Sequence, residues 1–597
     1  MAAAACVALV VAIVGPIGPT AAGAQAACPS TVDPAAFADA GQLRALNKVM
    51  ADLGPRPTAS PAQVDYIESI ESTIAGIGGF TLSAIPEQID LQTDESATIQ
   101  LGADDLPVAG PVPYAKPTGD AGVSGRLVHV PTGTAISATD VAGAIVVRPA
   151  ATAGVQYAIF GAVAYYLHDP DRTIDPVATY ERDSFGYQQR ITDLEEAAAG
   201  GAAGIVLVHD FPRAQVTGQY APYEGKRWDV PAVYVGADEG QRLIDAAGAG
   251  AGATLRTTAS RSPAQTRSVI ATLPGQSNER IVIQSHTDGM NAVWDNGPAA
   301  VLALASYFSK LPLSCRPRTL QFVFTTAHLH LSQSGAFCFA TILDEEYESG
   351  TVALVVAIEH LGAKEFAAVP RTDGGPGRQL VPTGQNELFV TFSMESPVLV
   401  EALIERVVAH DLRRSFVLRG ADAPRVGFPP HRSFGGEGGP YREFLVPTAA
   451  GITGPWTLYN PAFGLDELVD FDLMRRQALA FGDLVLKVDD VPRQVIAGGD
   501  NVYRPGRSLL GTDPLAEADA PHQGGCGPGA GNAALAAGGG GGGAPGDGHT
   551  DHAHGTGTAT AARLPATGDT GGADGWLALG VLVVALAGRA RGRTRRP

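Results

Sequence analysis

The stretch Ile281-Val282-Ile283-Gln284-Ser285-His286-Thr287-Asp288 runs from β-branched apolar residues directly into a polar cluster. Two later segments repeat this pattern: 319–326 is followed by Ala327-His328-Leu329-His330, and 351–358 is followed by Glu359-His360. Each segment is typical of a strand, because β-branched and aromatic residues favour strands. In an open α/β sheet, ligands bind in the crevice at the carboxyl ends of the strands. The three polar clusters are therefore expected to meet at one edge of a sheet.

Asp295-Asn296-Gly297-Pro298 marks the start of a helix that is predicted to run through Phe308. Asn296 is a suitable N-cap, and proline is accepted in the first helical turn. This start places the carboxylate of Asp295 at the same edge as the three clusters. Imidazole nitrogen and carboxylate oxygen together suit Zn²⁺. The convergence favours a metal or active site, with His286 as a ligand and Asp288 orienting its ring. Separate surface hydrogen-bonded pairs are the alternative.

Short β-branched strands alternate with alanine-rich helices upstream of about residue 511, which predicts an α/β architecture. Two blocks are expected. One covers 111–262, and the other is split around it into 34–110 and 263–490. Such an insert is easily accommodated when its two ends lie close together.

The block 111–262 resembles the protease-associated domain, a small α/β fold found in secreted hydrolases and receptors. The resemblance lies in Ala-Ala-Gly-Ile-Val-Leu-Val at 202–208 and Val-Pro-Ala-Val-Tyr-Val at 230–235. It implies a domain that carries no catalytic residue and that covers or shapes a substrate site. An α/β insertion of unrelated origin is the alternative.

The split block resembles the M28 family of zinc aminopeptidases and carboxypeptidases. Three motifs carry the resemblance: the stretch 281–288, then Asp295-Asn296-Gly297 with its alanine-rich helix, then Arg318-Thr319-Leu320-Gln321-Phe322-Val323-Phe324. Members with a protease-associated insert share this domain order. The resemblance implies a mixed, mostly parallel sheet flanked by helices. It also implies a site with two zinc ions that share one aspartate.

Carried over residue by residue, the resemblance assigns His286 and Glu359 to one zinc ion, Asp295 to the bridging position and Asp288 to the orientation of His286. Glu359 stands where the family has an aspartate. The second half of the site departs from the family. Two adjacent glutamates, one of them the general base, are replaced by His328-Leu329, and a late histidine is replaced by Asn460.

We therefore expect a single zinc ion held by His286, Asp295 and Glu359, with an open coordination position. His328 occupies the general-base position, where it is either a catalytic group or a fourth ligand. His330 points to the same side as His328 if the strand continues. The loop residues His431 and Glu437 either reach the site or are solvated.

Two functions fit these residues. The first is a metal-dependent peptidase that hydrolyses peptides or another amide outside the cell. The second is a catalytically inactive, peptidase-like surface protein that binds a ligand or partner. A wall-anchored adhesin without an inherited site is a weaker third reading. The net charge of −19 over 597 residues argues against nucleic acid as a partner, because like charges repel.

Both ends of the chain carry targeting signals. Residues 1–26 are predicted to be an apolar export signal with small residues at Ala24 and Ala26, although no Lys or Arg precedes the apolar run. Residues 564–597 resemble a sorting signal: Leu564-Pro565-Ala566-Thr567-Gly568, an apolar run and a basic tail. The apolar run is shorter than the roughly 20 residues of a full helical span.

By this resemblance a sortase cleaves between Thr567 and Gly568 and joins the chain to peptidoglycan. The predicted location is the Gram-positive cell wall, with the protein secreted and covalently anchored. Residues 511–562 lack large apolar side chains almost entirely, so they are predicted to form a flexible spacer.

Four cysteines remain once the export signal is removed: Cys28, Cys315, Cys338 and Cys526. An oxidising compartment allows them to pair, but the connectivity cannot be read from the sequence. A disulfide between Cys315 and Cys338 is predicted, with two isolated buried thiols as the alternative.

Overall fold

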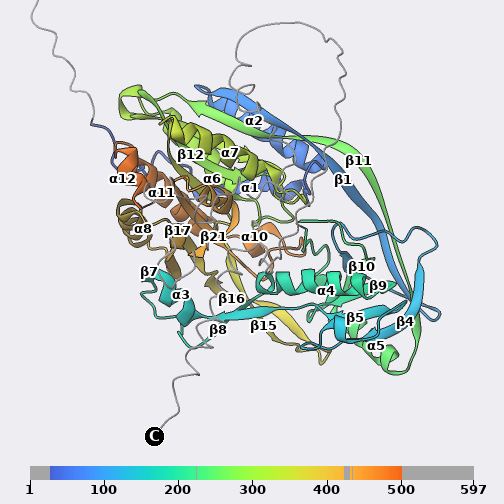
Figure 1. The fold of residues 1–597 in the computed structure, drawn as a ribbon. Helices are drawn as coiled ribbons and strands as arrows, with labels where there is room; N and C mark the ends of the chain where they lie inside the picture. The colour runs from blue at the N-terminus through green and yellow to red at the C-terminus, as the bar shows by residue number, and fades with distance from the viewer. Residues whose placement is uncertain (1–26, 224, 423–430, 433–434, 500–503, 505–597) are drawn as a thin grey trace, which may run out of the picture.

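The computed structural model describes residues 27–223, 225–422, 431–432, 435–499 and 504 (Figure 1). The predicted export signal, spacer and sorting signal, with Thr567 and Gly568, lie outside these ranges. Within them, no helix is both long and apolar enough to cross a membrane.

Four parallel strands form the centre of the main sheet, in the order β13 (Arg318–Thr325), β12 (Ser277–His286), β14 (Val352–Ile358) and β21 (Thr448–Thr453). These strands are buried over most of their length. Parallel strands covered on both faces read as continuous apolar runs, which explains the sequence pattern of 281–283, 320–324 and 352–358. The register places His286 beside Thr325 at the carboxyl edge.

The sheet becomes mixed on both sides of this centre. β17 (Phe389–Ser393) pairs antiparallel with β21 and parallel with β18 (Ser415–Arg419), while β11 (Gly252–Leu273) pairs antiparallel with β13. The predicted fold class, a mixed and mostly parallel sheet flanked by helices, is therefore confirmed.

Helices cover both faces of the sheet. One core cluster joins Ile281 and Ile283 to side chains of α1 (Ala40–Asp52), α2 (Pro61–Ile77), α6 (Gly297–Ser309), α8 (Pro397–Ala409) and α11 (Phe471–Val488). Val282 instead packs in a cluster with α7 (Ser334–Glu348), α9 (Gly439–Glu443) and α12 (Arg493–Ala497). Successive residues of a strand point to opposite faces, so β12 alone specifies two buried faces.

The second unit is a smaller α/β sheet. Its parallel strands are β4 (Val123–His129), β5 (Ile145–Pro149), β9 (Gly204–Val208) and β10 (Ala232–Val235), and β3 (Gly110–Pro111) pairs antiparallel at its edge. The helices are α4 (Tyr187–Ala199) and α5 (Ala237–Gly248). β9 and β10 fall within the apolar segments 202–208 and 230–235.

A long two-stranded ribbon connects the two units (Figure 1). β1 (Thr81–Leu101) runs antiparallel to β11, with Thr81 opposite Thr272 and Gln100 opposite Thr254; the short β2 (Asp104–Leu106) adds to its far end. β11 pairs with β13 near its C-terminal end and with β4 near its N-terminal end. One strand thus belongs to both sheets, and the ribbon leads the chain into and out of the smaller unit.

Part of the block 111–262 packs on the main sheet rather than on the smaller one. This part contains β6 (Ala153–Gln156), α3 (Tyr157–Val163), β7 (Ala164–His168) and β8 (Thr179–Arg182). β7 extends the main sheet by pairing antiparallel with β18. Phe160 and Tyr180 share a core cluster with Phe416 and Leu418. This pairing joins segments about 250 residues apart, so no local pattern in the sequence indicates it.

Shorter elements complete the described chain. An antiparallel hairpin of β15 (Lys364–Pro370) and β16 (Arg378–Asn386) forms a separate sheet, as do β19 (Ala421–Asp422) and β20 (His431–Arg432). The remaining helical turns are η1 (Ile136–Ala138), η2 (Asp183–Gly186), η3 (Arg213–Gln215), η4 (Leu313–Cys315), η5 (Gly436–Gly438) and α10 (Leu465–Leu468).

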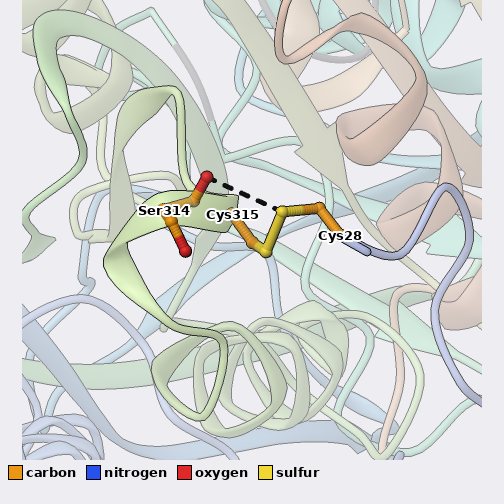
Figure 2. The surroundings of a disulfide bond; sticks show 3 residues. All are labelled: Cys28, Ser314 and Cys315. Atoms are coloured by element: carbon orange, nitrogen blue, oxygen red, sulfur yellow. Dashed lines mark hydrogen bonds between the residues drawn. A yellow bond between two sulfur atoms is a disulfide. The ribbon is translucent and has the colours of Figure 1, made fainter. Parts of the chain in front are cut away.

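The predicted disulfide between Cys315 and Cys338 is wrong, because Cys315 is bonded to Cys28 (Figure 2). Cys315 ends the turn η4, and Cys28 lies beside it near the start of the described chain. Cys338 lies in α7, packed into the cluster on one face of the main sheet. The bridge joins positions 287 residues apart. Closing so long a loop stabilises a fold by roughly 2–5 kcal/mol, chiefly by restricting the unfolded chain.

Candidate functional site

Three strand ends bring one candidate metal group together. The side chains of His286, His328 and Glu359 offer ligand atoms that all lie within 4.8 Å of one another. His286 is the last residue of β12, Glu359 follows β14 directly, and His328 follows β13 after two residues. All three residues are buried: His286 is 0% exposed, His328 7% and Glu359 1%. The meeting point expected from the sequence is thus formed by one residue from each cluster.

The backbone is strained where two of these strands end. Ala327, before His328, has a φ of 58°, and His360, after Glu359, has a φ of 52°. Non-glycine residues in the left-handed region cost of the order of 1–3 kcal/mol each, and they concentrate at functional sites. The strain here turns the chain sharply at the points that present the candidate ligands.

His286 is held in a fixed orientation with one nitrogen left over. Its Nδ1 donates to the backbone carbonyl of Asp288 at 2.7 Å, and its ring stacks on that of His328 with the centroids 4.2 Å apart. A neutral imidazole that donates from Nδ1 carries a lone pair on Nε2. That Nε2 lies 3.6 Å from Oε2 of Glu359. Two ligands at about 2.0–2.2 Å from a single zinc ion lie at a similar separation.

Several buried atoms at this point have no hydrogen-bond partner among the described residues, including Nε2 of His286, Oε2 of Glu359 and Nε2 of His360. The His360 nitrogen lies 3.7 Å from the same Glu359 oxygen. A buried polar group without a partner costs about 1–3 kcal/mol, so native structures rarely contain one without a ligand or an ion. His286, His328 and Glu359 therefore fit a metal ion, and the combination of imidazole and carboxylate suits zinc.

Glu437 connects the other candidate ligands. Its Oε1 lies 2.8 Å from Nδ1 of His328, and its Oε2 accepts from the hydroxyl of Thr325 at 2.8 Å. Its backbone N–H donates to Oε1 of Glu359 at 2.5 Å. Gly436 makes this approach possible, because a Cβ there would lie 2.3 Å from Glu359 Oε1. Of the two open alternatives for this residue, the structure shows the one in which it reaches the site.

The charges around the site favour a cation. Burial lowers the pKa of His286, but the nearby carboxylates of Asp288 and Glu359 and the charge of Glu437 raise it well above its usual value. Burial lowers the pKa of His360 to about 4, so this ring is neutral at pH 7. The carboxylates of Asp288, Glu359 and Glu437 thus attract a proton or a metal ion to the same place.

The carboxylate of Asp288 binds groups around the site and does not contact the ring of His286 closely. Its Oδ2 accepts from the backbone N–H of Leu329 at 2.8 Å and from the hydroxyl of Thr58. Its Oδ1 lies 3.7 Å from Nδ1 of His286. The orienting contact comes from the backbone carbonyl of Asp288, and the carboxylate ties together the segments after β12 and β13.

Asp295 is not one of the three residues of the candidate group, in contrast to the predicted ligand set. Both of its oxygens accept hydrogen bonds from Arg56. No local sequence pattern marks Arg56 as a functional residue, although its position between Pro55 and Pro57 is a usable signal. A backbone bridge between Arg56 and Gly289 places it there.

The two remaining sequence candidates play local roles. Nδ1 of His330 lies 2.8 Å from the hydroxyl of Ser332, and burial lowers the pKa of His330 to about 4. Asn460, where the family has a histidine, accepts through its side chain from the N–H of Ala462 at 3.1 Å. The side chain of His431 lies outside the described residues.

Aromatic side chains lie against the candidate ligands. The hydroxyl of Tyr223 lies 3.4 Å from Nε2 of His328, and its ring packs 5.6 Å from that of Trp294. Trp294 packs in turn on Tyr459 at 5.1 Å. Tyr223 belongs to the block 111–262, so that block contributes directly to the surroundings of the site.

The described fold is similar to the folds of a solved zinc aminopeptidase and a solved M28 peptidase. Among solved structures, it is similar to the zinc aminopeptidase BSAP from Bacillus subtilis, with a TM-score of 0.54 and 14% identity over 75% of this chain and 95% of that one. It is also similar to a peptidase M28 precursor from Shewanella amazonensis SB2B, with a TM-score of 0.53 and 16% identity over the same shares. No family model matches the sequence, and no curated protein matches it either.

Proposed function

We propose that the protein is a metal-dependent hydrolase of peptide or other amide bonds, with one zinc ion held by His286, His328 and Glu359. The observation that carries this proposal is the convergence of these three side chains, with Nε2 of His286 and Oε2 of Glu359 buried and unpaired. Three protein ligands leave an open coordination position, as in catalytic rather than structural zinc sites. The similarity to zinc aminopeptidase structures supports the same class of chemistry.

The surrounding residues prepare this site for a substrate. A zinc ion held there would polarise the carbonyl of a substrate and lower the pKa of a bound water. The carbonyl of Asp288 fixes the ring of His286, and Glu437 accepts from Nδ1 of His328. Second-sphere hydrogen bonds of this kind select the tautomer of a ligand and raise its basicity. Glu437 also holds a carboxylate oxygen beside the group, where a proton from a substrate or water can be accepted.

The test is zinc content and its removal. The purified protein is expected to contain about one zinc ion per chain, by elemental analysis, and to release amino acids from aminoacyl arylamides or short peptides. Chelation should remove both the zinc and the activity, and added zinc should restore them, because the three ligands are already positioned. A protein that contains no zinc and shows no turnover would contradict the proposal.

One observation favours a second function, that of a catalytically inactive binding protein. The candidate ligands are nearly inaccessible, and Tyr223 lies against His328. A binding protein that has kept a peptidase fold and a structural zinc ion would show this closure. Zinc at one ion per chain without turnover on any peptide would favour this alternative.

We also propose that the protein is exported and joined to the cell wall through the sorting signal at 564–568. The disulfide between Cys28 and Cys315 supports export, because such bonds persist in oxidising compartments. Deleting 564–568 should move the protein from the wall fraction to the membrane or the medium, as followed by immunoblotting of fractionated cells. Unchanged recovery from purified peptidoglycan would rule out this anchor.

A further inference from the structure

Arg56 and Asp295 form a fully buried ion pair beside the candidate metal group. Nη2 of Arg56 lies 2.7 Å from Oδ1 and 2.8 Å from Oδ2 of Asp295, and Nε lies 3.0 Å from Oδ2. Both side chains are 0% exposed. Charge-assisted contacts to both oxygens of a carboxylate are among the strongest hydrogen bonds in proteins.

The guanidinium has no donor left for another group. Nη1 donates to the carbonyl of Met50 at 2.7 Å and to that of Gly54, and Nη2 also donates to the carbonyl of Asn291 at 3.3 Å. The backbone of Arg56 pairs with Gly289 in both directions. A Cβ at Gly289 would lie 2.5 Å from the carboxyl carbon of Asp295, so the loop packs closely on this pair. Arg56 is therefore a fixed charge rather than a mobile one.

The contrast with the neighbouring ligands is direct. Nε2 of His286 and Oε2 of Glu359 are buried without a partner, whereas both oxygens of Asp295 accept from Arg56. A second metal ion bound to Asp295 would share this carboxylate with the fixed guanidinium of Arg56, and two buried positive charges beside one carboxylate repel each other. The two-zinc arrangement in which Asp295 bridges does not fit these residues.

The positions that would complete a second ion site are also engaged or unsuitable. Leu329 has no ligand atom, and its backbone N–H is bound to Asp288. Asn460 uses its side-chain oxygen within its own loop and its carbonyl oxygen for the side chain of Asn291. Leu329 and Asn460 therefore leave few side-chain atoms free to bind a second metal ion together with Asp295.

We propose that Arg56 is a built-in cation that takes the place of a second metal ion. Its guanidinium neutralises Asp295 and restricts the site to one ion, bound by His286, His328 and Glu359. Arg56 and Asp295 are positioning residues: they fix the segments 54–58 and 289–296 against each other beside the ligands. This inference deepens the proposed function and rests on it for the identity of the metal.

The experiment uses the mature protein and compares Asp295→Asn with Glu359→Gln, which each remove one negative charge from a buried carboxylate. Zinc content and zinc affinity are measured by competition with a chelator. Asp295→Asn should keep about one zinc ion per chain. Glu359→Gln should lose about 100-fold or more in affinity, since even outer-sphere changes cost 10- to 100-fold. Equal loss of zinc in both variants, or two ions in the wild type, would overturn the proposal.

A thermal double-mutant cycle provides a readout that does not require zinc. Arg56→Met and Asp295→Leu should each lower Tm by roughly 5 °C or more, because each leaves a buried charge unpaired. The double variant should lose clearly less than the sum, since both charges are gone. Additive losses would reject the pairing. A wild type without any zinc would contradict the proposed hydrolase, and the cycle would then still decide whether Arg56 neutralises Asp295.

Discussion

Replacing His286 with alanine is expected to release the zinc ion and to reduce hydrolysis to the background level. The change removes one of three ligands and the nitrogen that lies 3.6 Å from Oε2 of Glu359. Zinc affinity should fall by about 100-fold or more, a loss that outer-sphere substitutions alone can approach. Zinc content after dialysis and the rate of aminoacyl arylamide hydrolysis measure the two effects.

His330→Ala is the matched control for this prediction. His330 is also a buried histidine in the polar segment after β13, but its Nδ1 contacts Ser332 and it lies outside the candidate group. Its replacement should leave zinc content and turnover nearly unchanged, apart from a modest loss of stability. If His330→Ala released the zinc and His286→Ala did not, the assignment of ligands would be wrong.

Replacing Arg182 with alanine is expected to lower the free energy of unfolding strongly. Nη2 of Arg182 lies 2.7 Å from Oε1 of Glu387, and both side chains are buried. Removing one partner of a buried ion pair costs roughly 3–5 kcal/mol, because the remaining charge is left without compensation. The pair joins β8, in the block 111–262, to the main unit. Loss of the contact should therefore loosen the segment 153–186 from the main sheet.

The loss caused by Arg182→Ala should depend on pH. Burial raises the pKa of Glu387, and Arg182 offsets part of that rise. A carboxyl group with a raised pKa in the folded state destabilises the fold once it is ionised. The free energy of unfolding therefore falls as the pH rises from the pKa of the unfolded state through that of the folded state, and the fall is larger when Arg182 is absent. The variant should therefore be closer to the wild type at pH 5 than at pH 8.

Thermal unfolding at the two pH values measures this effect, with Arg44→Ala as the control. Arg44 forms a solvent-exposed pair with Asp466, and such pairs contribute at most about 1 kcal/mol. A loss in Arg182→Ala as small as that in Arg44→Ala would show that Glu387 finds other partners. An identical loss at pH 5 and pH 8 would exclude the ionisation of Glu387 as the cause.

Local sequence carried enough information to predict the strands of the main sheet and the edge at which their polar residues meet. The apolar runs that end in His286 and Glu359 made this possible, because parallel strands place their carboxyl ends on one edge. His328 was predicted at the same edge with two open roles. In the structure, a ring nitrogen of His328 lies within 4.8 Å of ligand atoms of His286 and Glu359.

Other parts of the site depend on contacts between distant segments. Arg56 lies 239 residues before Asp295, and Glu437 lies 78 residues after Glu359. Neither residue stands in a periodic pattern that would indicate its partner. The same reason explains the wrong disulfide, since Cys28 and Cys315 are 287 residues apart.

The sequence by itself determined the α/β architecture, and it predicted the candidate role of His286 and Glu359. These follow from strand periodicity and from the side chains that come directly after each strand, which are local properties. The tertiary structure decided which carboxylate is neutralised by Arg56 and which one faces His286 without a partner. It also decided which cysteine bonds to Cys315. Packing decides these points, because a buried charge or thiol pairs with whatever the fold places beside it.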